Sequence, residues 1–233
     1  MWIQNKMRLS FLGWLVLVFI IFAGTPSNAA HITLDSTKSA GEIDSLKSVY
    51  HQIKYTGPYT TSFYTALSAY PELKNTTIHF KHRNIKTTMQ CRPKVFSVFR
   101  KPDKRKFMMV FNRNQGKSRG VAIGELSFNA RVGLFAHEIA HVVDYVKMSS
   151  GQTIGQGFKY LTRSGKIALE HKIDRMVIWK GFGHQIYQYA HEVLSSQSIT
   201  DDYRIRRKRI YLQPAEIKAL VDIVENPSLN VNR

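Results

Sequence analysis

The sequence contains a single cysteine, Cys91, among its 233 residues, so no intramolecular disulfide can form. Disulfides stabilise many exported proteins, and a chain without one must draw its stability from its core or from a bound metal. Cys91 lies in a stretch flanked by Arg and Thr residues. This stretch is expected to be extended, so we interpret Cys91 as a structural or incidental residue rather than as a nucleophile.

Acidic residues are scarce: 16 Asp and Glu stand against 34 Lys and Arg, which gives a formal charge of +18. Such an excess favours acidic partners, such as an anionic envelope polymer, anionic lipid or nucleic acid, and does not bear on catalysis. The densest basic run extends from Arg204 to Arg209. It is interpreted either as a polyanion-binding patch or as a solvated basic face.

An uninterrupted apolar run long enough to cross a membrane is also lacking at the N-terminus. The run over residues 11–23 is shorter than the roughly 20 residues of a membrane span. Lys6 and Arg8 precede it and small residues follow at positions 27–30, an order typical of a secretory signal. We therefore predict a signal peptide over residues 1–29 and a secreted or periplasmic protein, with an uncleaved membrane anchor as the alternative. Loss of these two cations with the signal peptide lowers the charge from +18 to +16. Export removes the chain from nucleic acid, which is therefore not an expected partner.

Internal repeats are absent, which excludes a solenoid. At 43% hydrophobic residues, the chain can bury one core. We expect an N-terminal helical segment (30–75) to form one compact unit with a main domain (76–233). The predicted fold class is α+β: a small mixed sheet packed on a helix, followed by a mostly helical C-terminal part.

Local patterns predict the individual elements. Apolar spacing predicts helices over 36–53 and 59–70. Runs rich in β-branched and aromatic residues predict strands over 76–80, 85–90, 95–99, 107–112 and 121–126, with a hairpin through 101–104. Later helices are expected from a cap at Ser127 or Asn129 to about Met148, from Ser164 to Gly181, over 185–195 and over 213–224.

The residues His137-Glu138-Ile139-Ala140-His141 carry the clearest chemistry. On a helix, the two histidines project from the same face and can bind one metal. Glu138 is turned about 100° around the helix axis, so it can reach a water on the metal without binding the metal. The pattern predicts a Zn²⁺ site with ligands His137 and His141 and with Glu138 as general base.

A catalytic zinc needs a third protein ligand. A metzincin would carry a glycine three residues after His141 and a histidine six residues after it, but Asp144 and Lys147 occupy those positions, which excludes that class. Glu170 and Asp174, again four residues apart, are the favoured candidates. His171 and Asp144 are the competing third ligands.

With this pair, the chain resembles the gluzincin metallopeptidases, whose pattern is His-Glu-x-x-His followed on a later helix by Glu-x-x-x-Asp. The resemblance is one of motifs, covers about residues 106–182, and is nearest to the compact minigluzincin type. It implies a zincin-like fold, Glu170 as third zinc ligand, and Asp174 as hydrogen-bond acceptor for a ligand histidine, most simply His137. It also implies that an extended substrate lies along an edge strand, for which 107–112 is the matching element, although a core strand is the alternative there.

The sequence thus predicts an exported zinc metallopeptidase that acts on a peptide or protein. A zinc amidase acting on cell-wall peptide would share this chemistry. The alternative of another class is an envelope-binding or structural protein with a metal-braced fold and a basic surface for an anionic polymer or lipid. An oxyanion-stabilising donor is not identified by the sequence, although His184, Tyr187 and His191 are candidates.

Overall fold

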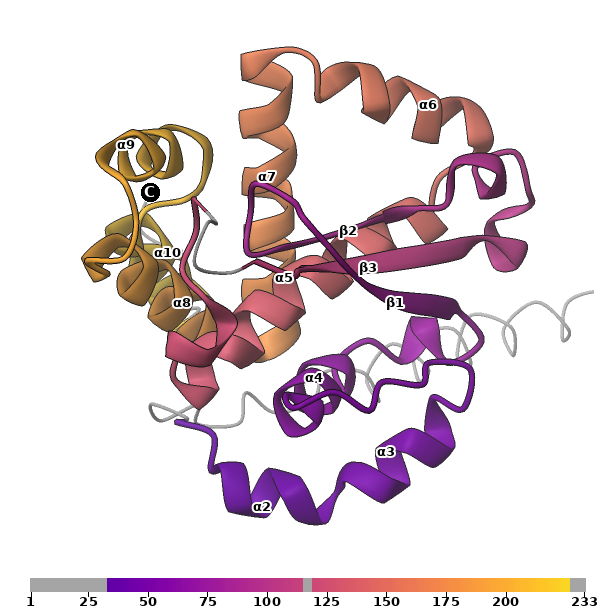
Figure 1. Ribbon diagram of the computed structural model, residues 1–233, viewed down its shortest axis with the longest axis horizontal. Coiled ribbons are helices and arrows are strands. Elements are labelled where there is room, and N and C mark those ends of the chain that lie inside the picture. The colour runs from indigo at the N-terminus through magenta and orange to yellow at the C-terminus, as the bar shows by residue number, and fades with distance from the viewer. Residues whose placement is uncertain (1–32, 115–118, 227–233) are drawn as a thin grey trace, which may run out of the picture. The chain divides into compact units, whose positions relative to one another are not determined.

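The computed structural model describes residues 33–114 and 119–226, and its elements follow the expected order of helices, sheet and helices (Figure 1). The predicted signal peptide lies outside the described residues. The α+β class, with its small mixed sheet and mostly helical C-terminal part, is confirmed. No helix among the described residues combines the length and apolar character needed to span a bilayer.

The N-terminal helices form where expected but are shorter. They are α2 (Ser36–Gly41), α3 (Ile43–Val49) and α4 (Thr60–Leu67), followed by the 3-10 helix η1 (Pro71–Leu73). The Asp35 side chain caps α2 by accepting hydrogen bonds from the Thr37 and Lys38 backbones. The predicted helix over 36–53 is divided at Glu42, which ends α2 and precedes α3.

The sheet consists of β1 (Thr77–Arg83), β2 (Met89–Pro93) and β3 (Lys106–Asn112), in the spatial order β1-β3-β2. β1 runs parallel to β3, with Ile78 opposite Phe107. β2 runs antiparallel to β3, with Cys91 opposite Met109. β2 is therefore an edge strand of a mixed sheet.

The proposal that residues 107–112 form an edge strand is wrong. β3 is the central strand and pairs on both sides. Its side chains explain this position, because Phe107, Met109 and Val110 are all almost fully buried although they point to alternate faces. The core-strand alternative is the one that holds.

Two other predicted strands are also wrong. Residues 95–99 contain the 3-10 helix η2 (Val95–Ser97), and residues 121–126 contain η5 (Ile123–Glu125). The predicted hairpin at 101–104 is the 3-10 helix η3 (Pro102–Lys104). β-branched and aromatic composition favours strands only where a partner strand is available to pair.

The C-terminal part is helical. Its elements are α5 (Phe128–Val146), α6 (Ser150–Lys159), α7 (Arg163–Val177), the π-helical turn η6 (Ile178–Phe182), α8 (Gly183–Ser195), α9 (Asp201–Ile210) and α10 (Pro214–Glu225). α6 and α9 were not expected from the sequence. Gly181 has φ of +88° within η6, a left-handed conformation that glycine adopts without strain, and it ends the run that begins with α7.

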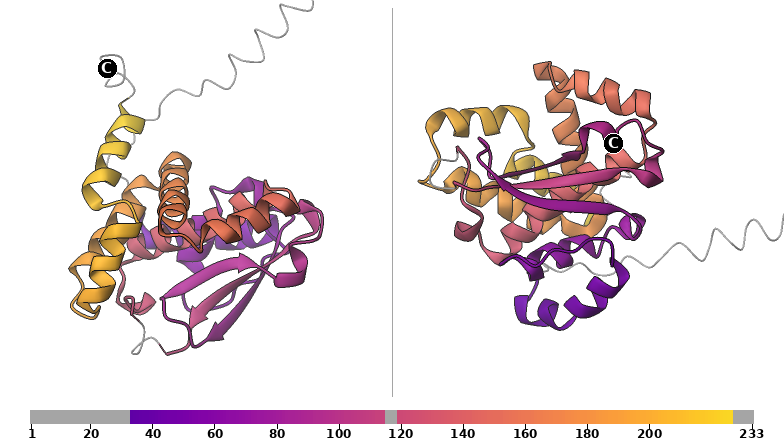
Figure 2. Two further views of the ribbon diagram at one scale, coloured as in Figure 1. Left: turned by 90° about the horizontal axis from the view of Figure 1, so that it is seen from above. Right: turned by 45° about the vertical axis from the view of Figure 1, so that its right-hand side comes forward.

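Helix α5 lies at the centre of the packing. It contacts α4, α7, α8 and the edge strand β2, and Figure 2 shows the sheet lying along it. The ring of Phe135 on α5 packs 5.5 Å from Phe63 on α4 and 6.2 Å from Phe111 on β3, measured between ring centroids. The N-terminal segment, the sheet and α5 therefore share one core.

Candidate metal centre

Helix α5 carries both histidines of the motif into the core. The Ser127 side chain accepts a hydrogen bond from the Ala130 backbone and so begins the helix, as one of the two predicted caps. Most residues of α5 are buried, and only 4% of His137 and 7% of His141 is exposed. The two rings stand in a T-shaped arrangement with centroids 4.9 Å apart. Their spacing of one helical turn thus produces adjacent, desolvated imidazoles.

Helix α7 brings Glu170 to the same point. Its Oε2 atom lies 3.2 Å from His137 Nε2 and 3.5 Å from His141 Nε2, and the two ring nitrogens are 3.2 Å apart. Ligands placed tetrahedrally at about 2.0–2.1 Å from zinc are separated from one another by about 3.3–3.4 Å. The three atoms therefore have the spacing of three corners of a zinc tetrahedron.

The donor set also fits a cation electrostatically. Glu170 Oε2 is buried and has no hydrogen-bond donor aligned with it among the described residues. Burial alone would raise the pKa of Glu170, but the interactions with His137 and His141 outweigh it and hold that pKa well below its usual range. A carboxylate that stays ionised in a buried place needs positive charge beside it. The buried His137, His141 and Glu170 group could hold a metal ion.

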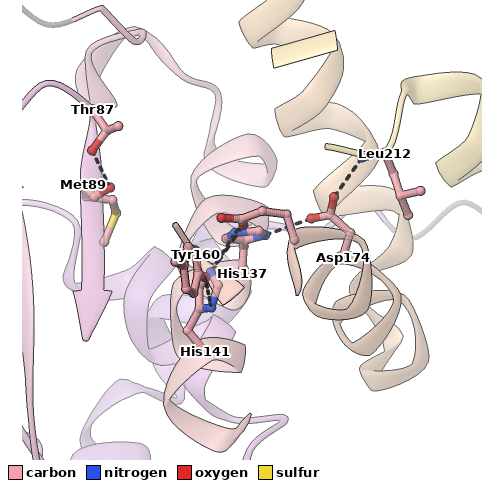
Figure 3. Close-up of polar contacts among 8 residues, drawn as sticks. Thr87, Met89, His137, His141, Tyr160, Asp174 and Leu212 are labelled. Atoms are coloured by element: carbon pink, nitrogen blue, oxygen red, sulfur yellow. Dashed lines mark hydrogen bonds and ion pairs between the residues drawn. The ribbon is translucent and has the colours of Figure 1, made fainter. Parts of the chain in front are cut away.

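Asp174, one turn after Glu170 on α7, contacts the other side of the His137 ring. Its Oδ1 lies 2.8 Å from His137 Nδ1, while its Oδ2 accepts a hydrogen bond of 3.2 Å from the Leu212 backbone (Figure 3). Burial alone would lower the pKa of His137, but Asp174 and Glu170 together raise it to about 10. In the neutral ring, with Nδ1–H donating to Asp174, the Nε2 lone pair is left free to bind a metal, and a bound cation would favour this neutral form over the protonated one.

Glu138 lies beside the triangle and is not one of its corners. Only 8% of the residue is exposed, and burial raises the pKa of its carboxyl. The nearby His141 and His137 rings and a hydrogen bond from the Cys91 backbone on β2 oppose this rise. A buried carboxyl with a raised pKa next to a metal site is suited to accept and return a proton.

Three residues near the site were not identified from the sequence. The Tyr160 hydroxyl, just after α6, lies 3.4 Å from His141 Nδ1 (Figure 3). The Tyr211 ring lies 5.8 Å from the His137 ring, and the Arg207 guanidinium sits 4.0 Å from the centre of the Tyr211 ring. Arg207 and Tyr211 are four residues apart, a spacing that predicts a contact once α9 is recognised as a helix.

The competing candidates for the third ligand and for the oxyanion donor make other contacts. The Asp144 carboxylate pairs with Lys172, and neither Asp144 nor His171 belongs to the group among the described residues that could hold a metal ion. His184 pairs with Glu225 at 2.6 Å.

The other two oxyanion candidates, Tyr187 and His191, stack on each other with ring centroids 6.1 Å apart. Cys91 is buried on β2, and burial raises the pKa of its thiol well above the usual value, which agrees with a structural role.

Comparison with known proteins identifies no relative of this chain. No protein-family model, curated protein or solved structure matches the chain. The candidate centre therefore depends on its own residues and distances: two imidazole nitrogens and one carboxylate oxygen, buried and within 4.8 Å of one another.

Proposed function

We propose that this chain is an exported zinc-dependent hydrolase, a peptidase of the gluzincin type. The observation that carries the proposal is the triangle of His137 Nε2, His141 Nε2 and Glu170 Oε2, with edges of 3.2, 3.5 and 3.2 Å. Nitrogen and oxygen donors at this spacing suit zinc. The histidine motif and the later Glu170–Asp174 pair connect the site to the gluzincin resemblance.

The number of ligands supports a catalytic rather than a structural centre. Structural zinc sites are almost always closed by four protein ligands, whereas catalytic sites use three and leave one position for water or substrate. Among the described residues the group has three members. Glu138 stands beside them as a buried carboxyl that a purely structural site would not require.

The chemistry follows from the roles of these side chains. When bound, zinc would lower the pKa of a coordinated water and polarise a substrate carbonyl. Glu138 would take the proton of the attacking water and return it to the leaving amine, a task that its raised pKa favours. Asp174 would orient His137 through Nδ1, and the Tyr160 hydroxyl stands in the corresponding place beside His141.

The edge strand β2 is the element that we propose for substrate binding. An extended peptide can pair with a sheet edge through its backbone, and β2 pairs with β3 on one side. The Cys91 backbone on β2 also hydrogen-bonds to Glu138, which brings this strand next to the proposed base. In this proposal β2 takes the role that the resemblance had suggested for β3.

The test compares zinc content and peptide hydrolysis in Glu138→Gln and His141→Ala. We expect one zinc per chain in the wild-type protein and in Glu138→Gln, with hydrolysis by Glu138→Gln reduced about 10²- to 10⁴-fold because the base is lost. His141→Ala should lose both zinc and hydrolysis. Glu42→Gln, the same chemical change at an exposed helix end, is the matched control and should retain both.

A folded wild-type chain that takes up no zinc would refute the proposal. Full activity in Glu138→Gln would instead favour the envelope-binding alternative, in which a metal only braces the fold. The amidase alternative is tested by offering the wild-type protein a cell-wall peptide amide beside an ordinary peptide. Hydrolysis of the former alone would replace the peptidase assignment and leave the zinc chemistry in place.

A further inference from the structure

The segment between β2 and β3, from Lys94 to Arg105, exposes large apolar side chains. Phe96 is 86% exposed, Phe99 is 70% exposed and Val95 is 65% exposed. The 3-10 helix η2 holds Val95 and Phe96 next to each other at the start of the segment. Single exposed apolar residues are common, but three within five positions form a local apolar surface.

The fold itself directs these side chains outward. The inner side of the segment is occupied by polar groups: Ser97 is buried and its hydroxyl accepts a hydrogen bond from the Lys106 backbone. Arg105 is 2% exposed, and its guanidinium donates to the Tyr145 carbonyl at 2.8 Å and to the Met148 carbonyl at 2.7 Å. Because buried polar groups fix the inner face, the aromatic rings cannot turn inward without breaking these bonds.

Cationic residues flank the exposed rings along the chain. The exposed cationic side chains on and next to the segment are Arg92, Arg100, Lys101, Lys104 and Lys106. The one acidic residue between Arg92 and Lys106 is Asp103, which lies 3.7 Å from the Lys104 ammonium group. The aromatic side chains thus stand in a strongly cationic neighbourhood.

We propose that this apolar and cationic surface, comprising Val95, Phe96, Phe99, Lys101 and Lys104, binds an anionic lipid bilayer. Protruding aromatic rings enter the boundary between headgroups and acyl chains, while flanking cations contact anionic headgroups. A polyanion without an apolar phase would engage the cations and leave the rings in water. The combination of the two kinds of side chain on one short segment is what favours lipid. The site is separate from the metal centre and does not depend on its function.

The experiment measures binding to vesicles by co-sedimentation. It uses the chain from Ile32 onward, which omits the apolar run 11–23. Among the residues that the structure describes, every member of the buried core cluster, from Ile43 to Val221, is retained. Vesicles of phosphatidylcholine mixed equally with phosphatidylglycerol are compared with vesicles of phosphatidylcholine alone. We expect binding to the anionic vesicles and much weaker binding to the neutral ones.

Two pairs of substitutions test the two contributions. Phe96→Ser with Phe99→Ser should lower the partition coefficient at least about tenfold, because two apolar side chains no longer leave water. Lys101→Gln with Lys104→Gln should lower it by roughly fivefold for each charge removed. Circular dichroism should show that both variants stay folded, since the altered side chains are exposed.

Matched controls change the same residue types at other places. Phe158→Ser with Leu161→Ser removes two exposed apolar side chains near the end of α6. Lys208→Gln with Arg209→Gln removes two exposed cations from α9. Both controls should bind the anionic vesicles as the unsubstituted chain does. Equal loss of binding in either control would overturn the assignment to this segment.

A fluorescence measurement distinguishes insertion into lipid from simple charge attraction. In the chain from Ile32, Trp179 is the single tryptophan, so Trp179→Phe with Phe96→Trp places one indole at the proposed contact. Its emission should shift to shorter wavelength on anionic vesicles and be quenched by brominated lipid. An unshifted emission, or loss of binding in the lysine pair but not in the phenylalanine pair, would show an electrostatic polyanion surface and overturn the proposal.

Discussion

Replacing Asp174 by Asn would test the arrangement around the proposed zinc ligands most directly. The Asp174 carboxylate accepts two hydrogen bonds, from His137 Nδ1 at 2.8 Å and from the Leu212 backbone at 3.2 Å, and only 1% of the residue is exposed. An amide has one acceptor oxygen and one donor nitrogen. Whichever way the Asn side chain turns, one of the two donors must face an NH₂ group.

The magnitude follows from that mismatch. Loss of the carboxylate behind a ligand histidine typically costs 10- to 100-fold in metal affinity, which corresponds to about 1.4–2.7 kcal/mol. A buried donor left without an acceptor costs a further 1–3 kcal/mol, roughly, in the stability of the folded chain. We therefore expect both a weaker zinc complex and a less stable metal-free protein.

Two assays separate these effects. Competition with a zinc-binding dye measures the affinity of the protein for zinc. Urea unfolding of the protein after a chelator has removed the zinc measures the stability of the metal-free fold. Asp144→Asn is the matched control, because Asp144 is buried on α5 one turn after His141 but pairs with Lys172 rather than with a ligand. It should lower stability and leave zinc affinity unchanged. Wild-type zinc affinity in Asp174→Asn would refute the orienting role of Asp174.

Four further substitutions test the stability of the fold and the surroundings of His141, the other proposed ligand histidine. Gly133→Ala should lower the free energy of unfolding in urea by about 3 kcal/mol or more, because a Cβ there would overlap the α8 backbone. Gly155 lies in α6 with open space around it. Gly155→Ala should therefore raise the melting temperature by about 2–4 °C. Arg105→Met should lower the free energy of unfolding by roughly 3 kcal/mol, because carbonyls at the end of α5 lose their donor. Tyr160→Phe should weaken zinc binding by less than tenfold in the dye competition, since its contact of 3.4 Å is at the outer limit of a hydrogen bond.

The sequence was informative where the structure depends on helical periodicity. His137 with His141, and Glu170 with Asp174, are each four residues apart, and this spacing alone places each pair on one helix face. The structure then brings His137, His141 and Glu170 into one group. The meeting of α5 and α7 is a tertiary contact, and the resemblance to a known motif, rather than the pattern itself, indicated it.

The sheet was harder to predict because strand order depends on contacts between distant residues. The run 95–99 has the composition of a strand, but the Ser97 hydroxyl binds the Lys106 backbone and the chain folds into a 3-10 helix. The run 121–126 buries Val121 and Ile123 without pairing as a strand. Composition indicated that these residues are apolar. It did not indicate which groups their backbone N–H and C=O groups would hydrogen-bond to.

The helices α6 and α9 were not predicted from the sequence, for two different reasons. α6 contains three glycines within its ten residues, which lowers its helix propensity, and its capping box of Ser149 and Gln152 was the signal that could have revealed it. In α9 the buried positions are Tyr203, Arg207 and Ile210. An arginine in the middle of this stripe breaks the apolar periodicity by which a helix is recognised.

That arginine also changes how the basic run Arg204 to Arg209 is understood. The Arg204 guanidinium donates to the Leu194 and Ser196 carbonyls at the end of α8. Arg207 is buried between the rings of Tyr189 and Tyr211, at 4.7 Å and 4.0 Å from their centres.

These contacts hold α9 against the body of the protein, and the residue that follows Tyr211 is Leu212, whose backbone donates to Asp174. Two arginines of the densest basic run, Arg204 and Arg207, thus hold in place the helix that leads to Leu212, which contacts Asp174 beside the candidate metal centre. Anionic partners can be bound only by cations that remain exposed, and those next to Phe96 and Phe99 combine exposure with an apolar surface.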